Sequence, residues 1–493
     1  RRQRQMCIRD SCATIWVCRD RCIRMPDKTP DGAGKPPAAS HSHGIAQAVT
    51  KLRYDDLPPE VVKHAKRLIV DTLVVAAAGA GRAGGTSSRA LRTAVPAAPG
   101  RSKPWFLRQP AGVHAVDATF VNTLHAAALD FDSLNRAVHA DLVCLPAAWS
   151  MAEASGAGGR DFIAAYVAGS ELVSRWSRAA QGPSKGWSGT SLYGGLGAAV
   201  AAGKLMQLPD VTLRHAIGLA CSQAAGTQQA NVEQVLSKRL QPALAARQGV
   251  FAAHLAASGA SAPEHALEGR FGLRALTQPG DDSQVLDGLW QQWQFLDTGL
   301  KAYPVCACSH AAIEACLSLR ARYRLNANDI ASVTATVSPF MARLVGAAFS
   351  RRGDAQVTAQ FSLRYHLACC LVHGRIGLDQ IEPQALDDPR VLPLIERIRI
   401  DIDPLNTAEL APASVSIVLQ GGREVTARCE QVVGGSEAPL TDEALFAKWT
   451  DCGARAETPL SADDLHRLVE QVDRLERIQH MDRLPPGLEG LIH

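Results

Sequence analysis

The sequence has no apolar run long enough to cross a membrane. The nearest candidate, residues 68–80, contains Asp71 and falls short of the roughly 18 to 20 residues that a span requires. The first residues are arginine-rich and lack the apolar core of a secretory signal. A net charge of +4 over 493 residues, with no basic run interleaved with aromatics, argues against nucleic-acid binding. We therefore expect a cytoplasmic protein with no membrane and no nucleic-acid partner.

Cysteine motifs for metal binding are also missing. The chain has 13 cysteines, and the four nearest the N-terminus are spaced unlike any common zinc site: Cys7, Cys12, Cys18 and Cys22. No C-x-x-C pair with further partners is present for an iron–sulfur cluster. An odd, dispersed set of cysteines is typical of reduced thiols in a reducing compartment. The sequence predicts no metal site.

What the sequence does contain is the composition of an ordinary globular protein. Hydrophobic residues make up 46% and charged residues 20%, and a length of 493 residues favours two domains. Residues 1–44 are the exception, because RRQRQMCIRDS resembles translated sequencing-adapter DNA and a Pro-, Gly- and Ser-rich run follows it. We predict a disordered or artefactual extension there, with Met25 as a plausible true start. A genuine cysteine-rich extension is the alternative.

Helical periodicity dominates from residue 43 onward. An N-cap, prolines and an acid at residues 56–60 precede apolar residues at helical spacing, and Asp161 precedes a second such run. Residues 194–205 are nearly all Gly and Ala, which predicts a helix that lets neighbouring backbones approach closely. Further helices are expected over residues 209–225, 310–319 and 441–475.

Alternating apolar residues interrupt this helical pattern after about residue 296. Residues 333–337 and 398–402 alternate, and the alternation of 415–419 and 425–429 around Gly421-Gly422 predicts a β-hairpin. We therefore predict a mainly α protein. Residues 45–296 and 437–493 form a large all-helical domain, and residues 297–436 form a smaller inserted α+β domain.

The stretch from His125 to Pro146 is where we expect the chemistry. Asp130 and Asp132 follow an alanine-rich run, and His139 comes nine residues after the first of them. Because Asp130 has Leu129 and Phe131 as neighbours, we expect an apolar setting that raises its pKa and pairs it with an imidazole for proton transfer. The alternative is a helix end whose acids cap the next segment.

Three other clusters carry polar side chains. Residues 186–191 precede the Gly/Ala helix, whose first amides favour an anionic group, unless this loop is only a tight packing turn. Lys238 and Arg239 precede another alanine-rich helix, where a solvated charge pair is the alternative. Lys301, with His310 after it, begins the second domain, and domain junctions are preferred ligand sites, although a lone lysine is usually surface.

Several motifs follow one another in a characteristic order. They include LPPEVVKHAKRLIVDTL, HAAALDFDS, GTSLYGGLGAAVAAGKLMQL, KRLQPALAARQGVFAAHLAASG, LKAYPVCACSHAAIEA and AQFSLRYHLA. Each is weak alone, but their order and spacing over residues 45–480 resemble the MmgE/PrpD family. This family includes 2-methylcitrate dehydratase, cis-aconitate decarboxylase and iminodisuccinate epimerase.

The resemblance implies a homodimer of mainly α subunits in which the smaller α+β domain forms a lid over the helical domain. The active site would lie in the cleft between them and would need no cofactor and no metal. Family members act on small di- or tricarboxylates by taking a proton next to a carboxylate. The resemblance therefore implies a small polycarboxylate substrate.

The site residues implied by the resemblance fall into two sets. The acid/base set contains Asp130 and His139, while Lys238 and Lys301 would hold substrate carboxylates and offset charge in an enediolate-like intermediate. Tyr365 would donate a hydrogen bond or a proton. The substrate-binding set comprises Ser188, Thr190, Gln241 and His310.

The chain departs from the family pattern at several of these motifs. Leu134 replaces a threonine, Ser188 and Gln241 replace histidines, and Asp141 stands in the motif of the first histidine. The histidine usual at position 188 is a leading proton-transfer candidate in the decarboxylase and dehydratase, and serine cannot act as a base near neutral pH. Losing such a partner typically costs ~10²–10⁴-fold in rate. Either His139 or another group covers the role, or the substrate differs, or activity is low.

The leading hypothesis is a metal-independent lyase (a hydro-lyase) that acts on a small polycarboxylate, nominally by dehydration of a 2-methylcitrate-like hydroxy acid. An epimerase, an isomerase or a cis-aconitate decarboxylase-like enzyme of the same family is the first alternative. The second is a catalytically lapsed paralogue that binds polycarboxylates without turnover.

Overall fold

The computed structural model describes residues 40–81, 84, 99–107, 112–181 and 185–493. The predictions for residues 1–39 lie outside this described part. Residues Ser40–His493 cluster as one unit. The first helix begins at His41, and the Ser40 side chain caps it by accepting a hydrogen bond from the backbone N–H of His43. Residues 41–44 are therefore helical, and not the linker that their composition predicted.

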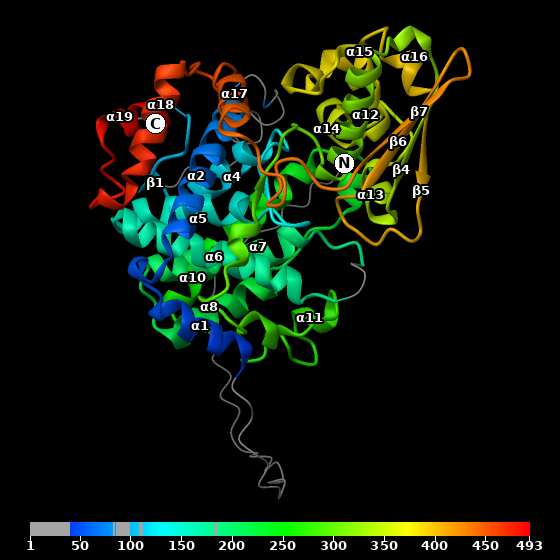
Figure 1. Cartoon of the computed structure of the whole chain (residues 1–493). Coiled ribbons are helices and arrows are strands. Elements are labelled where there is room, and N and C mark those ends of the chain that lie inside the picture. Colours follow the sequence, from blue (N-terminus) through cyan, green and yellow to red (C-terminus); the bar gives the residue numbers. More distant parts are fainter. Residues whose placement is uncertain (1–39, 82–83, 85–98, 108–111, 182–184) are drawn as a thin grey trace, which may run out of the picture. The chain divides into compact units, whose positions relative to one another are not determined.

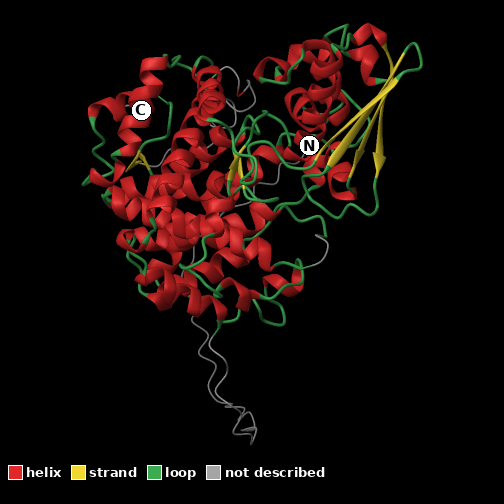
Figure 2. Cartoon of the chain, in the orientation of Figure 1, coloured by secondary structure: helices red, strands yellow, loops and turns green. Residues whose placement is uncertain are grey.

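Helices form most of the described chain up to residue 276, as Figures 1 and 2 show. Their bounds are α1 (His41–Lys51), α2 (Pro59–Ala80), α4 (Ala115–Ala127), α5 (Ala140–Ser155), α6 (Gly159–Ala179), α7 (Gly189–Leu205), α8 (Asp210–Ser222), α9 (Gln229–Val232), α10 (Ser237–Ala257) and α11 (Leu273–Leu276). The helices predicted near residues 56–72, 161–176, 194–205 and 209–225 are confirmed as α2, α6, α7 and α8.

The Gly/Ala helix α7 lies at the centre of this helical packing and contacts α5, α6, α8 and α10. A Cβ on Gly197 would lie 2.7 Å from the Cys144 sulfur and 2.9 Å from the carbonyl oxygen of Gly169. A Cβ on Gly249 would press against the carbonyl oxygen of Gly195. The missing side chains therefore let the backbones of α6, α7 and α10 approach closely, as predicted.

The four longest strands of the described residues lie after residue 329 and form one sheet, which Figure 2 shows in yellow. A four-stranded sheet has the order β5 (Ile398–Ile402), β4 (Ile330–Val337), β6 (Ala413–Leu419), β7 (Glu424–Cys429). β4 is parallel to β5 and antiparallel to β6, and β6 pairs with β7 as the predicted hairpin. The helices of this part are α12 (His310–Tyr323), α13 (Pro339–Val345), α14 (Ala355–Phe361), α15 (Leu363–His373) and α16 (Leu392–Ile395). α12 packs against β6 and β7.

Two further connections tie distant segments together. The short strand β2 (Ser133–Leu134) pairs with β3 (Gly299–Leu300), so the loop after α4 meets the residues just before Lys301. The last helices are α17 (Asp442–Gly453), α18 (Ala462–Asp473) and α19 (Pro486–Ile492), and α17 and α18 pack against α2. The remaining strand is β1 (Pro99–Ser102). Among the residues described, no helix is long and apolar enough to cross a membrane.

The close packing of α7 and α10 predicts that Gly249→Ala destabilises the protein. Alanine is favoured over glycine inside a helix by ~1 kcal/mol, but overpacking against backbone atoms typically costs about 1–3 kcal/mol. We expect a lower free energy of unfolding in urea. Gly490→Ala in α19 is the matched control because nothing lies within 4 Å of its added Cβ, so that variant should be neutral or slightly more stable. Equal effects of the two substitutions would contradict the packing argument.

Candidate active site

Asp130 lies in the loop after α4 and is held between two lysines. Its backbone adopts the left-handed conformation, with φ +49°, which aspartate and asparagine adopt more readily than other residues that have a side chain. Its carboxylate accepts hydrogen bonds from Lys238, in the first turn of α10, and from the Lys301 ammonium at 3.0 Å. Lys301 also donates to the backbone carbonyl of Asp130 at 2.9 Å. Three distant segments therefore meet at one buried carboxylate.

The electrostatics of Asp130 differ from the sequence-based expectation. Burial does raise the pKa of a carboxyl group, as expected, but Lys238 and Lys301 outweigh it and hold the pKa of Asp130 far below its usual range. Conversely, although burial opposes it, Asp130 and Asp132 hold the pKa of Lys301 above its usual range. The expected raised pKa of Asp130 is therefore wrong, because two cations distant in sequence stabilise its charged form. Asp130 is therefore ionised near neutral pH and holds two ammonium groups.

His139 pairs with the second carboxylate of the same loop. Its Nδ1 lies 2.7 Å from Asp132 Oδ2 and 2.9 Å from the carbonyl oxygen of Ser133. These contacts favour a proton on Nδ1 and leave Nε2 as the ring nitrogen available to a ligand. Asp132 is buried, but His139 and, more weakly, Lys301 hold its pKa well below the usual range. A carboxylate that orients a histidine in this way is a common feature of proton-transfer sites.

Buried polar groups from outside the loop hold its backbone in place. Lys448, from α17, donates to the carbonyl of Phe131 at 2.9 Å and pairs with Asp71 Oδ1 at 2.8 Å. Gln360 donates to the carbonyl of Ala128 at 3.2 Å. The loop carbonyls at positions 128, 130 and 131 therefore all accept hydrogen bonds from side chains, which limits movement of the carboxylates between them.

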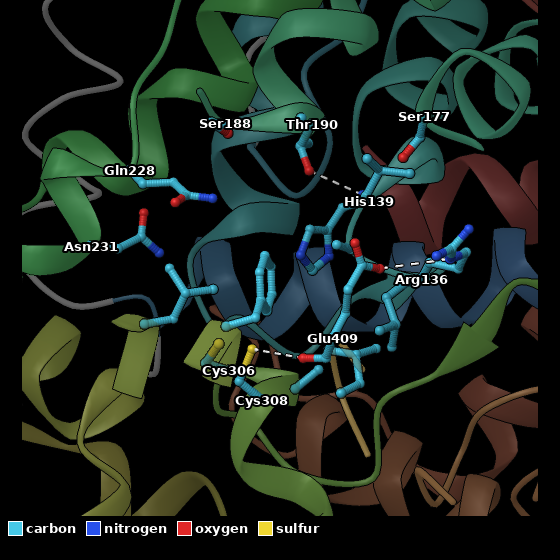
Figure 3. Close-up of a pocket in the computed structure, with 18 of the residues that line it drawn as sticks. Arg136, His139, Ser177, Ser188, Thr190, Gln228, Asn231, Cys306, Cys308 and Glu409 are labelled. Carbon is cyan, nitrogen blue, oxygen red and sulfur yellow. Dashed lines mark hydrogen bonds and ion pairs between the residues drawn. The ribbon is translucent and has the colours of Figure 1, made fainter. Parts of the chain in front are cut away.

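A cavity of about 720 Å³ opens beside these residues. Figure 3 shows His139 beside Thr190 on its wall, with Cys306, Cys308 and Glu409 also lining it. The lining combines the loop after α4, the starts of α7 and α10, and residues 306–308, 339–344 and 404–410. Six of the nine predicted site residues line it: Asp130, His139, Ser188, Thr190, Lys238 and Gln241.

The first turn of α7 contributes the polar loop that the sequence indicated. Ser188 is the N-cap residue but makes no capping hydrogen bond, and its hydroxyl lies 3.1 Å from that of Ser191. Thr190 Oγ1 accepts a hydrogen bond from the backbone N–H of His139 at 3.0 Å. Gln241 donates to the Thr227 carbonyl at 3.0 Å. A helix start that faces a cavity suits a carboxylate ligand.

The other three predicted site residues do not line the cavity. Lys301 lies directly behind it and reaches it only through Asp130 and Asp132. The ring of His310 packs edge-on against Tyr303, and burial lowers its pKa to about 3, so it is neutral. The Tyr365 hydroxyl donates to the carbonyl of Gln380 at 2.6 Å, and its ring stacks on Phe349.

Sequence reasoning did not single out several residues that line the cavity. Arg136 and Glu409 face each other, with Arg136 Nε 3.6 Å from Glu409 Oε2, and Arg343 lies on α13. A hydrogen bond with Cys308 lowers the pKa of Cys306, against burial and Asp130. The only feature of the sequence that could have pointed to any of these residues was the C-x-C spacing of the two cysteines. No group of three or more potential metal ligands occurs within the described residues.

Comparison with known proteins gives consistent results over most of the chain. The family model of the MmgE/PrpD N-terminal domain matches residues 43–285, and that of the MmgE/PrpD C-terminal domain matches residues 303–474.

Individual relatives match over nearly their whole length. A cis-aconitate decarboxylase-like protein of Aspergillus oryzae, oryM, is 27% identical over 95% of this chain and 100% of its own length. The cis-aconitate decarboxylase of Aspergillus terreus is 27% identical over 88% of this chain and 93% of its own. That of Homo sapiens is 26% identical over 92% of this chain and 95% of its own.

The position of Asp130 between two cations predicts how stability depends on pH. We expect Asp130→Asn to lower the free energy of unfolding at pH 7 by about 3–5 kcal/mol, because buried ammonium groups lose their counter-charge. The folded-state pKa lies below the unfolded value, so this contribution is complete above about pH 4 and declines as the pH falls. The difference in the free energy of unfolding between wild type and variant should therefore narrow by about 1.4 kcal/mol per pH unit below pH 4.

Urea unfolding of both proteins from pH 7 to pH 2.5 measures this gap. Asp297→Asn is the control, because Asp297 pairs with Arg178 near the surface and its side chain is 49% exposed. Its gap from wild type should stay small at every pH. A gap for Asp130→Asn that is constant with pH, or that widens in acid, would show that the carboxylate does not carry the charge assigned to it.

Proposed function

We propose, from the premise that this chain belongs to the MmgE/PrpD family, that it is a lyase acting on a small tricarboxylate by proton transfer next to a carboxylate. The observation that carries this proposal is the pairing of His139 with Asp132 on the wall of a cavity that also presents Lys238. An imidazole with one nitrogen fixed and the other available can deliver a proton. The neighbouring ammonium can offset negative charge on an enolate-like intermediate.

Decarboxylation of cis-aconitate is the reaction we favour, because the relatives matched over most of their length are named for it. The bond to the departing carboxylate breaks, and its electron pair forms a new carbon–carbon double bond. The electrons of the old double bond take a proton at the carbon next to another carboxylate. The products are carbon dioxide and methylenesuccinate (itaconate), so the site must supply one proton and stabilise a carboxylate-conjugated carbanion.

The described residues suit these two tasks. His139, protonated on Nε2, would deliver the proton, while Asp132 fixes the ring and offsets its charge. Lys238 would contact the substrate directly, and Lys301 would act from behind through Asp130. The first amides of α7, beside Ser188, would bind a carboxylate without taking part in proton transfer. His139 would then cover the role of the histidine that is absent at position 188.

Dehydration of 2-methylcitrate and epimerisation both begin with the removal of a proton next to a carboxylate. Dehydration also requires an acid for the leaving hydroxyl group. His139 is the one histidine among the described residues that line the cavity. A single histidine suits protonation of a carbanion better than a reaction that needs both a base and an acid. We therefore place decarboxylation ahead of dehydration.

The decisive experiment incubates the purified protein with cis-aconitate in D₂O and follows the products by proton NMR. We expect itaconate carrying deuterium at the methylene group that received the proton. His139→Gln should lower kcat by ~10²–10⁴-fold, as loss of a proton-transfer group does. His480→Gln is the matched control, because its ring also bonds a backbone carbonyl, at 3.0 Å from Gly156, but lies exposed and outside the cavity lining.

Other outcomes identify the competing functions. A rise in ultraviolet absorbance with 2-methylcitrate and none of the itaconate signals would identify a dehydratase. Deuterium exchange at an α-carbon without a net product would identify an epimerase. Ligand binding with no exchange on any of these acids would identify a lapsed enzyme.

We also propose that the chain forms a homodimer, as the family resemblance implies. The chain mass is 52.5 kDa. Light scattering behind a size-exclusion column should therefore give about twice this mass across a tenfold range of protein concentration. A mass equal to that of one chain would contradict this proposal without affecting the proposed reaction.

A further inference from the structure

Apart from the proton that His139 would carry for the reaction, the charges that line the cavity are balanced, with one exception. The charged side chains on its wall are Asp130, Asp132, Arg136, Lys238, Arg343 and Glu409. Lys238 and the lysine behind it, Lys301, are matched by the two aspartates. Arg136 lies 3.6 Å from Glu409. In the described part of the chain, Arg343 has no carboxylate partner.

The surroundings of Arg343 hold its guanidinium in place without giving it a counter-charge. Its guanidinium lies 5.1 Å from the centre of the Phe340 ring, which orients it without neutralising it. Met341 and Val345 of the same helix are fully buried, so α13 is anchored by its opposite face. The helix is also fixed at both ends, where Ser338 caps the N–H of Met341 and Arg364 bonds the carbonyl of Gly346. The Arg343 side chain therefore belongs to a helix that is firmly anchored at the cavity wall.

The net charge of the site without a ligand shows why an unpaired arginine matters for binding. While His139 is unprotonated at Nε2, two aspartates offset two lysines and Glu409 offsets Arg136, so those groups present little net charge to a ligand. A ligand with three carboxylates brings three negative charges into the cavity. The start of α7 can bind one of them and Lys238 can contact a second. The third carboxylate needs a cation of its own, since an unpaired buried charge is costly.

We propose that Arg343 binds one carboxylate of the ligand and thereby makes the site selective for tricarboxylates over dicarboxylates. The choice of ligand class rests on the proposed function. Arginine suits this task because its planar fork can donate two parallel hydrogen bonds to one carboxylate, whereas lysine offers a point charge. Arg343 is thus a specificity-determining residue contributed by the sheet-containing part of the chain.

The test measures binding of two unreactive acids by calorimetry at fixed low salt: propane-1,2,3-tricarboxylate and the dicarboxylate glutarate. We expect Arg343→Ala to weaken tricarboxylate binding by about 10–100-fold, the range for a lost hydrogen bond to a charged group. Glutarate binding should change by less than about threefold, and Arg343→Lys should give an intermediate loss. The discrimination between the two acids should therefore fall with the Arg343→Ala substitution.

Arg322→Ala is the matched control. Arg322 is also a helix-borne arginine over a neighbouring aromatic ring, 5.3 Å from the centre of Tyr323, but it does not line the cavity. It should leave both affinities unchanged. If Arg343→Ala leaves the ratio of the tricarboxylate affinity to the glutarate affinity as it is in the wild type, the proposal is wrong. This holds whether neither affinity falls or both fall equally.

The two levels of inference can fail separately. If the wild type shows Arg343-dependent selectivity but turns over none of the acids, the proposed reaction is wrong and the binding site stands. If the wild type decarboxylates cis-aconitate and Arg343→Ala leaves KM unchanged, the reaction stands and the role of Arg343 is wrong. With an active enzyme we expect Arg343→Ala to raise KM for cis-aconitate about 10-fold or more, with a smaller effect on kcat.

Discussion

The rest of the site depends on one interaction, the contact of Asp130 with Lys238 and Lys301. A carboxylate with 3% exposure cannot remain ionised without nearby cations, and a fully buried ammonium cannot remain protonated without anions. Asp130 and Lys301 therefore require each other, and the partly exposed Lys238 supplies the second cation. Since these groups come from the loop after α4, the start of α10 and the residue after β3, their contact fixes the relative positions of three segments. A binding cavity follows from this constraint, because its wall is made of these same segments.

Much of the secondary structure could be predicted from local sequence, whereas the electrostatics of the site could not. The apolar spacing after residues 56–60 predicted α2, and the alternation around Gly421-Gly422 predicted the β6–β7 hairpin, because both depend on neighbouring residues alone. The pKa of Asp130 was predicted in the wrong direction from its neighbours Leu129 and Phe131. The groups that decide its charge are 108 and 171 residues away in the chain. Only the folded arrangement brings them together.

The family motifs identified residues near the site better than they identified roles. Six of the nine residues line the cavity, but Tyr365 bonds the carbonyl of Gln380 and His310 packs against Tyr303. A motif marks a segment that must fold in a particular way, and some of its residues serve that folding and not the ligand. Arg343 was not singled out for the opposite reason. It belongs to none of the motifs, and an exposed arginine on a short helix looks like any surface residue until the cavity is seen.

The two parts of the site follow different physical rules. The lysines and aspartates of the deep part balance one another, and this part is preorganised and supported by buried donors such as Lys448 and Gln360 on the loop carbonyls. Such a part stabilises charge that develops during a reaction, because its groups need not reorganise. It gains little from a fully charged ligand, since its cations are already paired. An unpaired cation at the wall, as proposed for Arg343, would add attraction that the paired groups do not supply. A division between an unpaired binding cation and a paired reactive set lets affinity and rate be adjusted independently.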